Sequence, residues 1–154
     1  MAASRIDALL TDYASYHRTR GNLACHVAGI TLILFGIFSM LGALHLPPFG
    51  PIVTLTGAEA LIAAALLYYL FLDVPLALAL LAECAALDLA ARAVHDWRVG
   101  LAAFAAGWVF QGIGHAAYEK NSPAFFKNLL HLMTGPVFLL NELLKLRPVP
   151  SAAN

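Results

Sequence analysis

Four histidines fall near the same end of the helices that the sequence predicts, although they are far apart along the chain. His17 and His26 flank the start of the first long apolar segment. His115 lies near the end of the fourth such segment, and His131 follows in the last one. Imidazole is a common ligand of iron, zinc, copper and nickel. Packing that brings these rings to one mouth of a helix bundle would therefore create a site for a divalent metal ion.

The spacing of the histidines does not by itself establish a metal site. His17 and His26 are nine residues apart, so they do not share a helix face in the way that residues four apart do. A single histidine at a membrane interface is more often a polar anchor than a ligand, and both interpretations stay open on spacing alone. His45 and His95 fall at the opposite ends of the predicted spans, away from the other four.

Composition restricts the class of protein that carries these residues. The chain has 154 residues, of which 61% are hydrophobic and only 12% are charged, whereas a soluble domain has about 25% charged residues. A soluble fold of this size would bury only about 70% of the surface that its chain exposes. A soluble enzyme, a disordered tail and a disulfide-rich secreted module are therefore excluded. Nine basic residues balance nine acidic ones, so no overall field favours nucleic acid.

The apolar segments predict an all-α integral membrane protein with a single membrane domain over residues 1–154. About 20 apolar residues cross a bilayer, and we expect four transmembrane helices, over residues 23–46, 52–72, 76–93 and 99–118. Residues 4–17 have the pattern of an amphipathic interfacial helix. Residues 125–146 are apolar but interrupted by Gly135-Pro136. This last segment is expected to be re-entrant or interfacial, and a fifth span is the remaining alternative.

The distribution of basic residues predicts how the chain is oriented in the membrane, and the glycines predict where its helices pack closely. With four spans, more basic residues lie on the side of the chain's two ends than on the other side, which favours cytoplasmic ends and a cytoplasmic site. The residues compared are Arg5, Arg18, Arg20, Lys120 and Lys127 against Arg92 and Arg98. Close helix packing is expected at the small residues Gly29, Gly36, Gly107, Gly112 and Gly114.

Acidic residues within the predicted spans suggest a rival function. Intramembrane carboxylates mark transport pathways in many membrane proteins. A small helical transporter that uses Glu59, Glu83 and Asp88 is therefore one alternative, although Asp88 and Arg92 also have the spacing of a structural helix pair. A non-enzymatic membrane subunit, in which the histidines are only interfacial, is the other alternative. The sequence leaves the oligomeric state open.

Two motifs of several residues separate these alternatives. Tyr16-His17, Asn22 and His26-Val27-Ala28-Gly29-Ile30 follow the pattern Y-H-x4-N-x3-H-x2-G-I. Residues 111–123 follow the pattern Q-x-I-G-H-x3-E-K-x2-P. Together with Gly135-Pro136 and Glu142, the motifs resemble the family of the yeast endoplasmic-reticulum 2-hydroxy fatty acid dioxygenase and its bacterial homologues. The resemblance covers roughly residues 4–146.

The resemblance implies an iron(II)-dependent dioxygenase that uses molecular oxygen to shorten a 2-hydroxy fatty acid by one carbon, that is, fatty acid α-oxidation. It implies Fe²⁺ as the cofactor, with His17, His26 and His115 as ligands and His131 as the next candidate. The location implied is a multi-pass position in the bacterial inner membrane or the endoplasmic reticulum, in contact with membrane lipid.

Other residues around the motifs are assigned supporting roles. Asn22, Gln111 and Glu119 are candidates for orienting a ligand or the substrate, and Glu119 could also complete the metal shell. The cationic residues Arg18, Arg20 and Lys120 lie on the same predicted face and could hold the substrate carboxylate. The same cations fit a positive-inside flank equally, so both interpretations stay open.

Overall fold

A computed structural model describes residues 4–47, 55–120 and 129–148. In these ranges the regular elements are helices, apart from one isolated bridge between His45 and Thr56. The helices are α1 (Arg5–Ser15), α2 (Arg20–Gly42), α3 (Gly57–Leu70), α4 (Val74–Val94), α5 (Trp97–Ile113), the π-helical η1 (Gly114–Glu119) and α6 (Leu130–Leu144). The expected all-α fold class is confirmed.

Three of the described helices are long and apolar enough to cross a membrane: Arg20–Gly42, Val74–Val94, and Trp97–Glu119, in which η1 continues α5. The span expected over residues 52–72 is shorter. Residues 52–54 lie outside the described residues, and the helix begins at Gly57 because Thr56 and Glu59 form a capping box at its start. At 14 residues, α3 is about 21 Å long, which is less than the thickness of a bilayer core.

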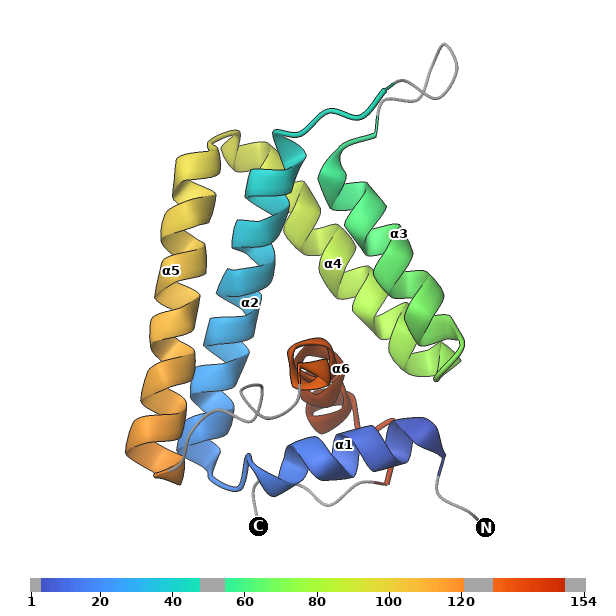
Figure 1. The fold of residues 1–154 in the computed structure, drawn as a ribbon, viewed down its shortest axis with the longest axis vertical. Coiled ribbons are helices and arrows are strands. Elements are labelled where there is room, and N and C mark those ends of the chain that lie inside the picture. Colours follow the sequence, from blue (N-terminus) through green and yellow to red (C-terminus); the bar gives the residue numbers. More distant parts are fainter. Residues whose placement is uncertain (1–3, 48–54, 121–128, 149–154) are drawn as a thin grey trace.

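The closest packing in the fold joins α2 and α5, which run antiparallel side by side (Figure 1). A Cβ added at Gly107 would lie 2.6 Å from the carbonyl oxygen of Gly29, and one added at Gly36 would lie 2.7 Å from the Cβ of Phe104. Only glycine permits this approach. The expectation was wrong for Gly112, where an added Cβ meets nothing within 4 Å.

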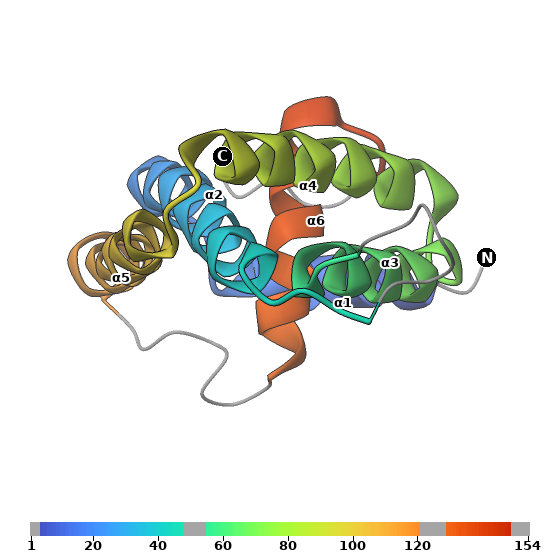
Figure 2. The same cartoon turned by 90° about the horizontal axis from the view of Figure 1, so that it is seen from above.

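Helices α1 and α6 lie across the axes of α2 and α5 at one end of the bundle. In Figure 1 α6 is viewed nearly along its axis, and in Figure 2 it crosses beside α2. The expected interruption at Gly135-Pro136 does not occur, because α6 continues through both residues. Fully buried Val137 and Phe138 anchor the helix beyond the proline, and this packing offsets the lost backbone hydrogen bond. That this segment does not cross the bilayer stays a prediction.

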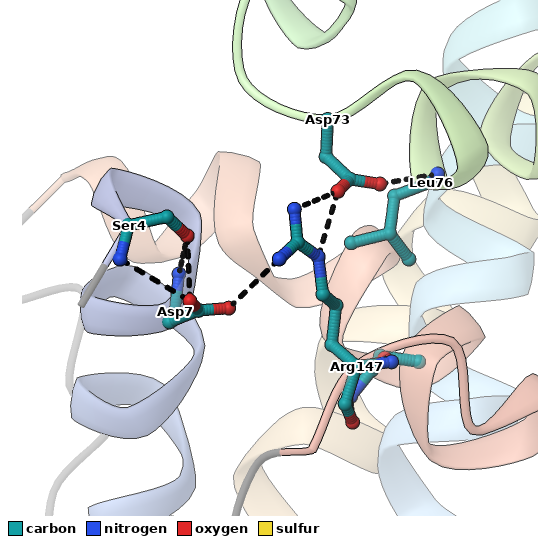
Figure 3. A network of polar contacts seen from close by, with 6 residues as sticks. Ser4, Asp7, Asp73, Leu76 and Arg147 are labelled. Carbon is teal, nitrogen blue, oxygen red and sulfur yellow. Dashed lines mark hydrogen bonds and ion pairs between the residues drawn. The ribbon is translucent and has the colours of Figure 1, made fainter. Parts of the chain in front are cut away.

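An arginine near the C-terminus ties three elements together at the same end (Figure 3). The Nε of Arg147 donates to Oδ2 of Asp73 at 2.7 Å, and its Nη1 lies 3.5 Å from Oδ1 of Asp7 in α1. Asp73 also caps α4 by accepting from the backbone N–H of Leu76 at 2.8 Å. The Ser4 hydroxyl, which donates to Asp7, is the main cause that lowers the pKa of that carboxyl. The network fixes α1 against the start of α4.

The glycine contacts predict a position-specific effect of side-chain volume. We expect Gly107→Val to lower the free energy of unfolding by about 1–3 kcal/mol, because its side chain meets the α2 backbone. Thermal unfolding in detergent, followed by circular dichroism, measures the change. Gly112→Val is the matched control and is expected to unfold near the wild-type temperature. Equal destabilisation by both variants would contradict the glycine contact as its cause.

Candidate metal centre

Three of the predicted ligands come together where α1, α2 and η1 meet. The side chains of His17, His26 and His115 are at most 3% exposed. One ring nitrogen from each lies within 4.8 Å of the others, and the Nε2 atoms of His17 and His26 are 3.0 Å apart. The ring centroids are separated by 4.4 to 5.0 Å. The three side chains, which are far apart in sequence, thus form one compact buried cluster.

Hydrogen bonds fix the tautomers of two of these rings. The Nδ1–H of His17 donates to the carbonyl oxygen of Tyr13 at 2.7 Å, and the Nδ1–H of His26 donates to that of Asn22 at 3.0 Å. A neutral imidazole that donates through Nδ1 has a lone pair at Nε2. The two Nε2 atoms that face each other at 3.0 Å are therefore both acceptors in the neutral state, an arrangement that a shared cation stabilises.

The surroundings of His17 favour the form that binds metal. Burial lowers its pKa to about 4, so the ring is neutral at physiological pH, as a ligand must be. Its ring stacks on that of Tyr13 with centroids 3.9 Å apart and planes 4° apart. Carbonyl acceptors behind ligand imidazoles, like those of Tyr13 and Asn22, are the usual outer partners in protein metal sites. The donor set therefore fits a divalent transition metal.

Glu119 lies beside the cluster and connects η1 to the start of α2. Its Oε1 accepts from the backbone N–H groups of Arg18 and Thr19, at 2.6 and 2.8 Å, and from the Thr19 hydroxyl at 3.1 Å. The side-chain amide of Asn22 donates to the same oxygen at 3.1 Å. Through these four hydrogen bonds to one oxygen, Glu119 holds the segment that follows His17 against η1. The role of Glu119 in a metal shell stays a prediction.

The π-helical turn brings His115 close to α2. Gly114 opens this turn, and a Cβ there would collide with Oδ1 of Asn22 and lie 3.0 Å from the Cβ of Cys25. Glycine thus permits the contact between η1 and α2. Asn22 is fully buried: its carbonyl orients His26, and its amide group holds Glu119. The motif residues Asn22 and Glu119 therefore act on the geometry of the cluster.

The fourth predicted ligand, His131, lies outside the group of three. Its Nε2 is 2.7 Å from Oδ2 of Asp12, and its ring lies 5.5 Å from those of Tyr13 and Tyr16. Its Nδ1 is buried and has no hydrogen-bond partner among the described residues. An imidazole that donates to a carboxylate through one nitrogen retains an available lone pair on the other. The role of His131 as a fourth ligand stays a prediction.

The three histidines and His131 line one end of a mostly apolar cavity of about 320 Å³. Gln111 lines the same cavity and is 7% exposed. Its amide nitrogen has no hydrogen-bond partner among the described residues. An unsatisfied buried donor is costly, and a ligand in the cavity would satisfy it. The motif residue Gln111 therefore supplies a polar contact in an apolar space.

The cationic candidates are not part of the cavity lining. Arg18, Arg20 and Lys120 are exposed, and none of them lines this cavity. The guanidinium of Arg18 donates through Nε to the carbonyl of Ser15 at 2.9 Å. The role of these three side chains in binding a carboxylate stays a prediction. The structure adds Asp12 to the site, for which sequence spacing gave no signal because its partner is 119 residues away.

The opposite end of the bundle contains the other two histidines and an ion-pair network. His45 and His95 line a separate cavity of about 270 Å³ there, so the predicted sorting of the histidines is confirmed. Glu59 caps α3 and forms an ion pair with Arg92, which also contacts Asp88 at 2.7 Å. Two of the three acids in the transporter alternative thus have structural partners.

The cluster predicts stoichiometric binding of a divalent metal ion. We expect about one ferrous or cobaltous ion per purified chain, and a loss of binding by at least about tenfold in His26→Gln or His115→Gln, because each substitution removes a ring nitrogen of the cluster. Anaerobic titration with elemental analysis measures the metal content.

The control variants are His45→Gln and His95→Gln, which are expected to keep wild-type metal content because both residues lie at the other end. A loss of metal in the control variants as large as that in His26→Gln would contradict the assignment.

Comparison with known proteins places the whole described fold in one family. A family model described as 2-hydroxy-palmitic acid dioxygenase Mpo1-like matches residues 3–146. The chain is 30% identical over 136 residues to the 2-hydroxy-palmitic acid dioxygenase MPO1 of Saccharomyces cerevisiae, covering 86% of this chain and 75% of the yeast protein. No solved structure matches the chain. The chain, an all-helical membrane protein, therefore belongs to the Mpo1-like family.

Proposed function

We propose that the protein is an iron(II)-dependent 2-hydroxy fatty acid dioxygenase that shortens its substrate by one carbon. The observation that carries the proposal is the pair of Nε2 acceptors of His17 and His26, 3.0 Å apart at the end of an apolar cavity. Membership of a family described as 2-hydroxy-palmitic acid dioxygenase Mpo1-like supports the reaction.

Three imidazoles would hold the iron: those of His17, His26 and His115. Ferrous iron in such a site, when bound, supplies binding and activation of molecular oxygen. The chain's own contribution is to keep the two facing imidazoles unprotonated at Nε2, through the carbonyls of Tyr13 and Asn22. We assign His131 as the candidate fourth ligand, through Nδ1, with Asp12 orienting its ring.

The substrate has a polar head and an apolar tail, and the cavity has the same division. The hydroxyl and carboxylate of the acid would lie at the histidine end, where the side-chain amide of Gln111 can donate a hydrogen bond to the carboxylate. Asn22 and Glu119 keep the ligand-bearing segments in register. The apolar lining excludes water from the reacting carbons. Arg18, Arg20 and Lys120, exposed near the same end of the bundle, would attract the carboxylate to that end.

The location of the site follows from the helix ends that form it. The cluster lies near the start of α2 and the start of η1, at the end of the bundle where α1 and α6 lie (Figure 1). We place this end at the cytoplasmic boundary of the membrane, on the basis of the positive-inside charge distribution. A lipid acid can reach such a boundary site without leaving the bilayer.

Reconstitution tests the reaction directly. Detergent-purified protein is loaded with ferrous iron under anaerobic conditions and then given oxygen and 2-hydroxyhexadecanoic acid. We expect an acid one carbon shorter, with His45→Gln active and His115→Gln inactive, since only His115 belongs to the cluster. Mass spectrometry of the fatty acids measures the product. Iron-loaded protein that consumes no oxygen with any 2-hydroxy acid would rule out the proposed function.

The amide of Gln111 is expected to contribute mainly to substrate binding. Gln111→Leu keeps the approximate size of the side chain but removes the donor, so KM for the acid is expected to rise about tenfold, the effect of losing a hydrogen bond to a charged group. Steady-state oxygen consumption gives KM and kcat separately. Gln111→Glu, which places a like charge near the carboxylate, is expected to raise KM further. An unchanged KM in both variants would show that Gln111 does not contact the substrate.

A further inference from the structure

The cavity extends from the histidine cluster along the interface of two long helices. On α2 it is lined by residues at helical spacing from His26 to Ile37. On α5 it is lined from Gln111 through Trp108 to Phe104. The side chains beyond the histidines and Gln111 are aliphatic or aromatic on both helices, and Leu132 and Pro136 of α6 add to the apolar wall. We name this space the apolar groove.

The two walls of the groove end at the same level. A Cβ at Gly36, next to Ile37, would lie 2.7 Å from the Cβ of Phe104, so the far ends of the two walls are neighbours. At the near end, an added Cβ at Gly114 would lie 3.3 Å from Nδ1 of His26, so His115 is level with His26. Eleven residues separate the two levels on each helix, which corresponds to about 16 Å at 1.5 Å per residue.

The geometry points to a chain-length ruler: the apolar groove receives the acyl chain of the acid, and Phe104 with Ile37 limits its length. This inference rests on the proposed function, because the histidine cluster fixes the head of the same substrate. An extended polypeptide advances at most about 3.6 Å over three backbone bonds, or about 1.2 Å per bond. A groove of about 16 Å therefore holds about 13 carbon–carbon bonds. With its head carbons at the cluster, the preferred acid has about 15 carbons, close to the palmitic chain in the yeast relative's name.

Substitutions at the far end test the ruler in both directions. Ile37→Trp adds volume there and is expected to lower kcat/KM for 2-hydroxyhexadecanoic acid about tenfold or more, since one misplaced methylene already changes discrimination by about that factor. Activity toward an acid shorter by about four carbons is expected to stay within about twofold of wild type. Phe104→Ala keeps the Cβ that meets Gly36 but removes the ring, so the optimum is expected to shift to longer acids.

Phe110→Ala is the matched control, because it removes the same ring from the same helix at a position that does not line the groove. It is expected to leave the chain-length profile unchanged. The inference is overturned if Ile37→Trp and Phe104→Ala remain active with the wild-type profile, or if Phe110→Ala shifts the profile as much as they do.

A binding measurement without turnover separates this inference from the reaction. The chain has two tryptophans: Trp108 lines the groove, whereas Trp97 begins α5 at the other end. A 2-hydroxy acid brominated at mid-chain is expected to quench Trp108 in the Trp97→Phe variant, and unlabelled acid is expected to reverse the quenching. Trp97, left alone in Trp108→Phe, is expected to show no reversible quenching.

The two measurements give distinguishable outcomes. Reversible quenching of Trp108 without any product would support the groove and reject the proposed dioxygenase. Product formation with equal quenching of both tryptophans and an unshifted chain-length profile would support the dioxygenase and reject the ruler. Loss of both signals would reject both assignments.

Discussion

The close approach of the α2 and α5 backbones is the constraint on which the rest of the structure depends. Glycines seven residues apart, about two helical turns, form a stripe on each helix: Gly29 and Gly36 on α2, and Gly100 and Gly107 on α5. Carbonyl oxygens of one helix lie where a side chain of the other would begin, so the helices have little freedom to slide. The stripe thereby fixes an antiparallel register. The same spacing continued to Gly114 brings η1 level with the first turns of α2, and the histidine cluster follows from that register.

A second set of contacts positions the histidines at the end of this helix pair. Glu119 accepts hydrogen bonds from the backbone N–H groups of Arg18 and Thr19, just before α2, where a carboxylate is also favoured by the helix dipole. This contact fixes the turn between α1 and α2, and thereby the position of His17. Tyr13 contacts two of the histidines: its carbonyl orients His17, and its ring packs beside His131. Arg147 holds the other end of α1 through Asp7. The positions of the candidate ligands therefore depend on contacts among four segments: α1, the start of α2, η1 and the segment after α6.

Features that depend on a single helix could be predicted from the sequence, whereas features that depend on packing between helices could not. Helix ends could be predicted to within five residues, which was sufficient to assign His17, His26 and His115 to one end and His45 and His95 to the other. Continuity of α6 through Pro136 could not be predicted, because it depends on burial of the residues that follow. The orientation of Gly112 depends on the exact helical phase, which apolar content alone does not define. The pairing of His131 with Asp12 joins distant segments, and no local pattern reports such a contact.

The direction of the apolar groove has a consequence for substrates that reside in a membrane. A fatty acid in a bilayer already has its chain in an apolar medium, so transfer into the groove gains little from the hydrophobic effect. Shape and the polar contacts at the head must then provide the discrimination. The groove runs along α2 and α5, the helices of spanning length, so an acid bound as proposed would keep the orientation that it has in the bilayer. Its carboxylate would stay near the boundary and avoid the cost of burying a charge in the apolar core. Buried imidazoles at the ends of spanning helices would therefore allow the polar group of the proposed substrate to react without leaving the level of the bilayer where it is already solvated.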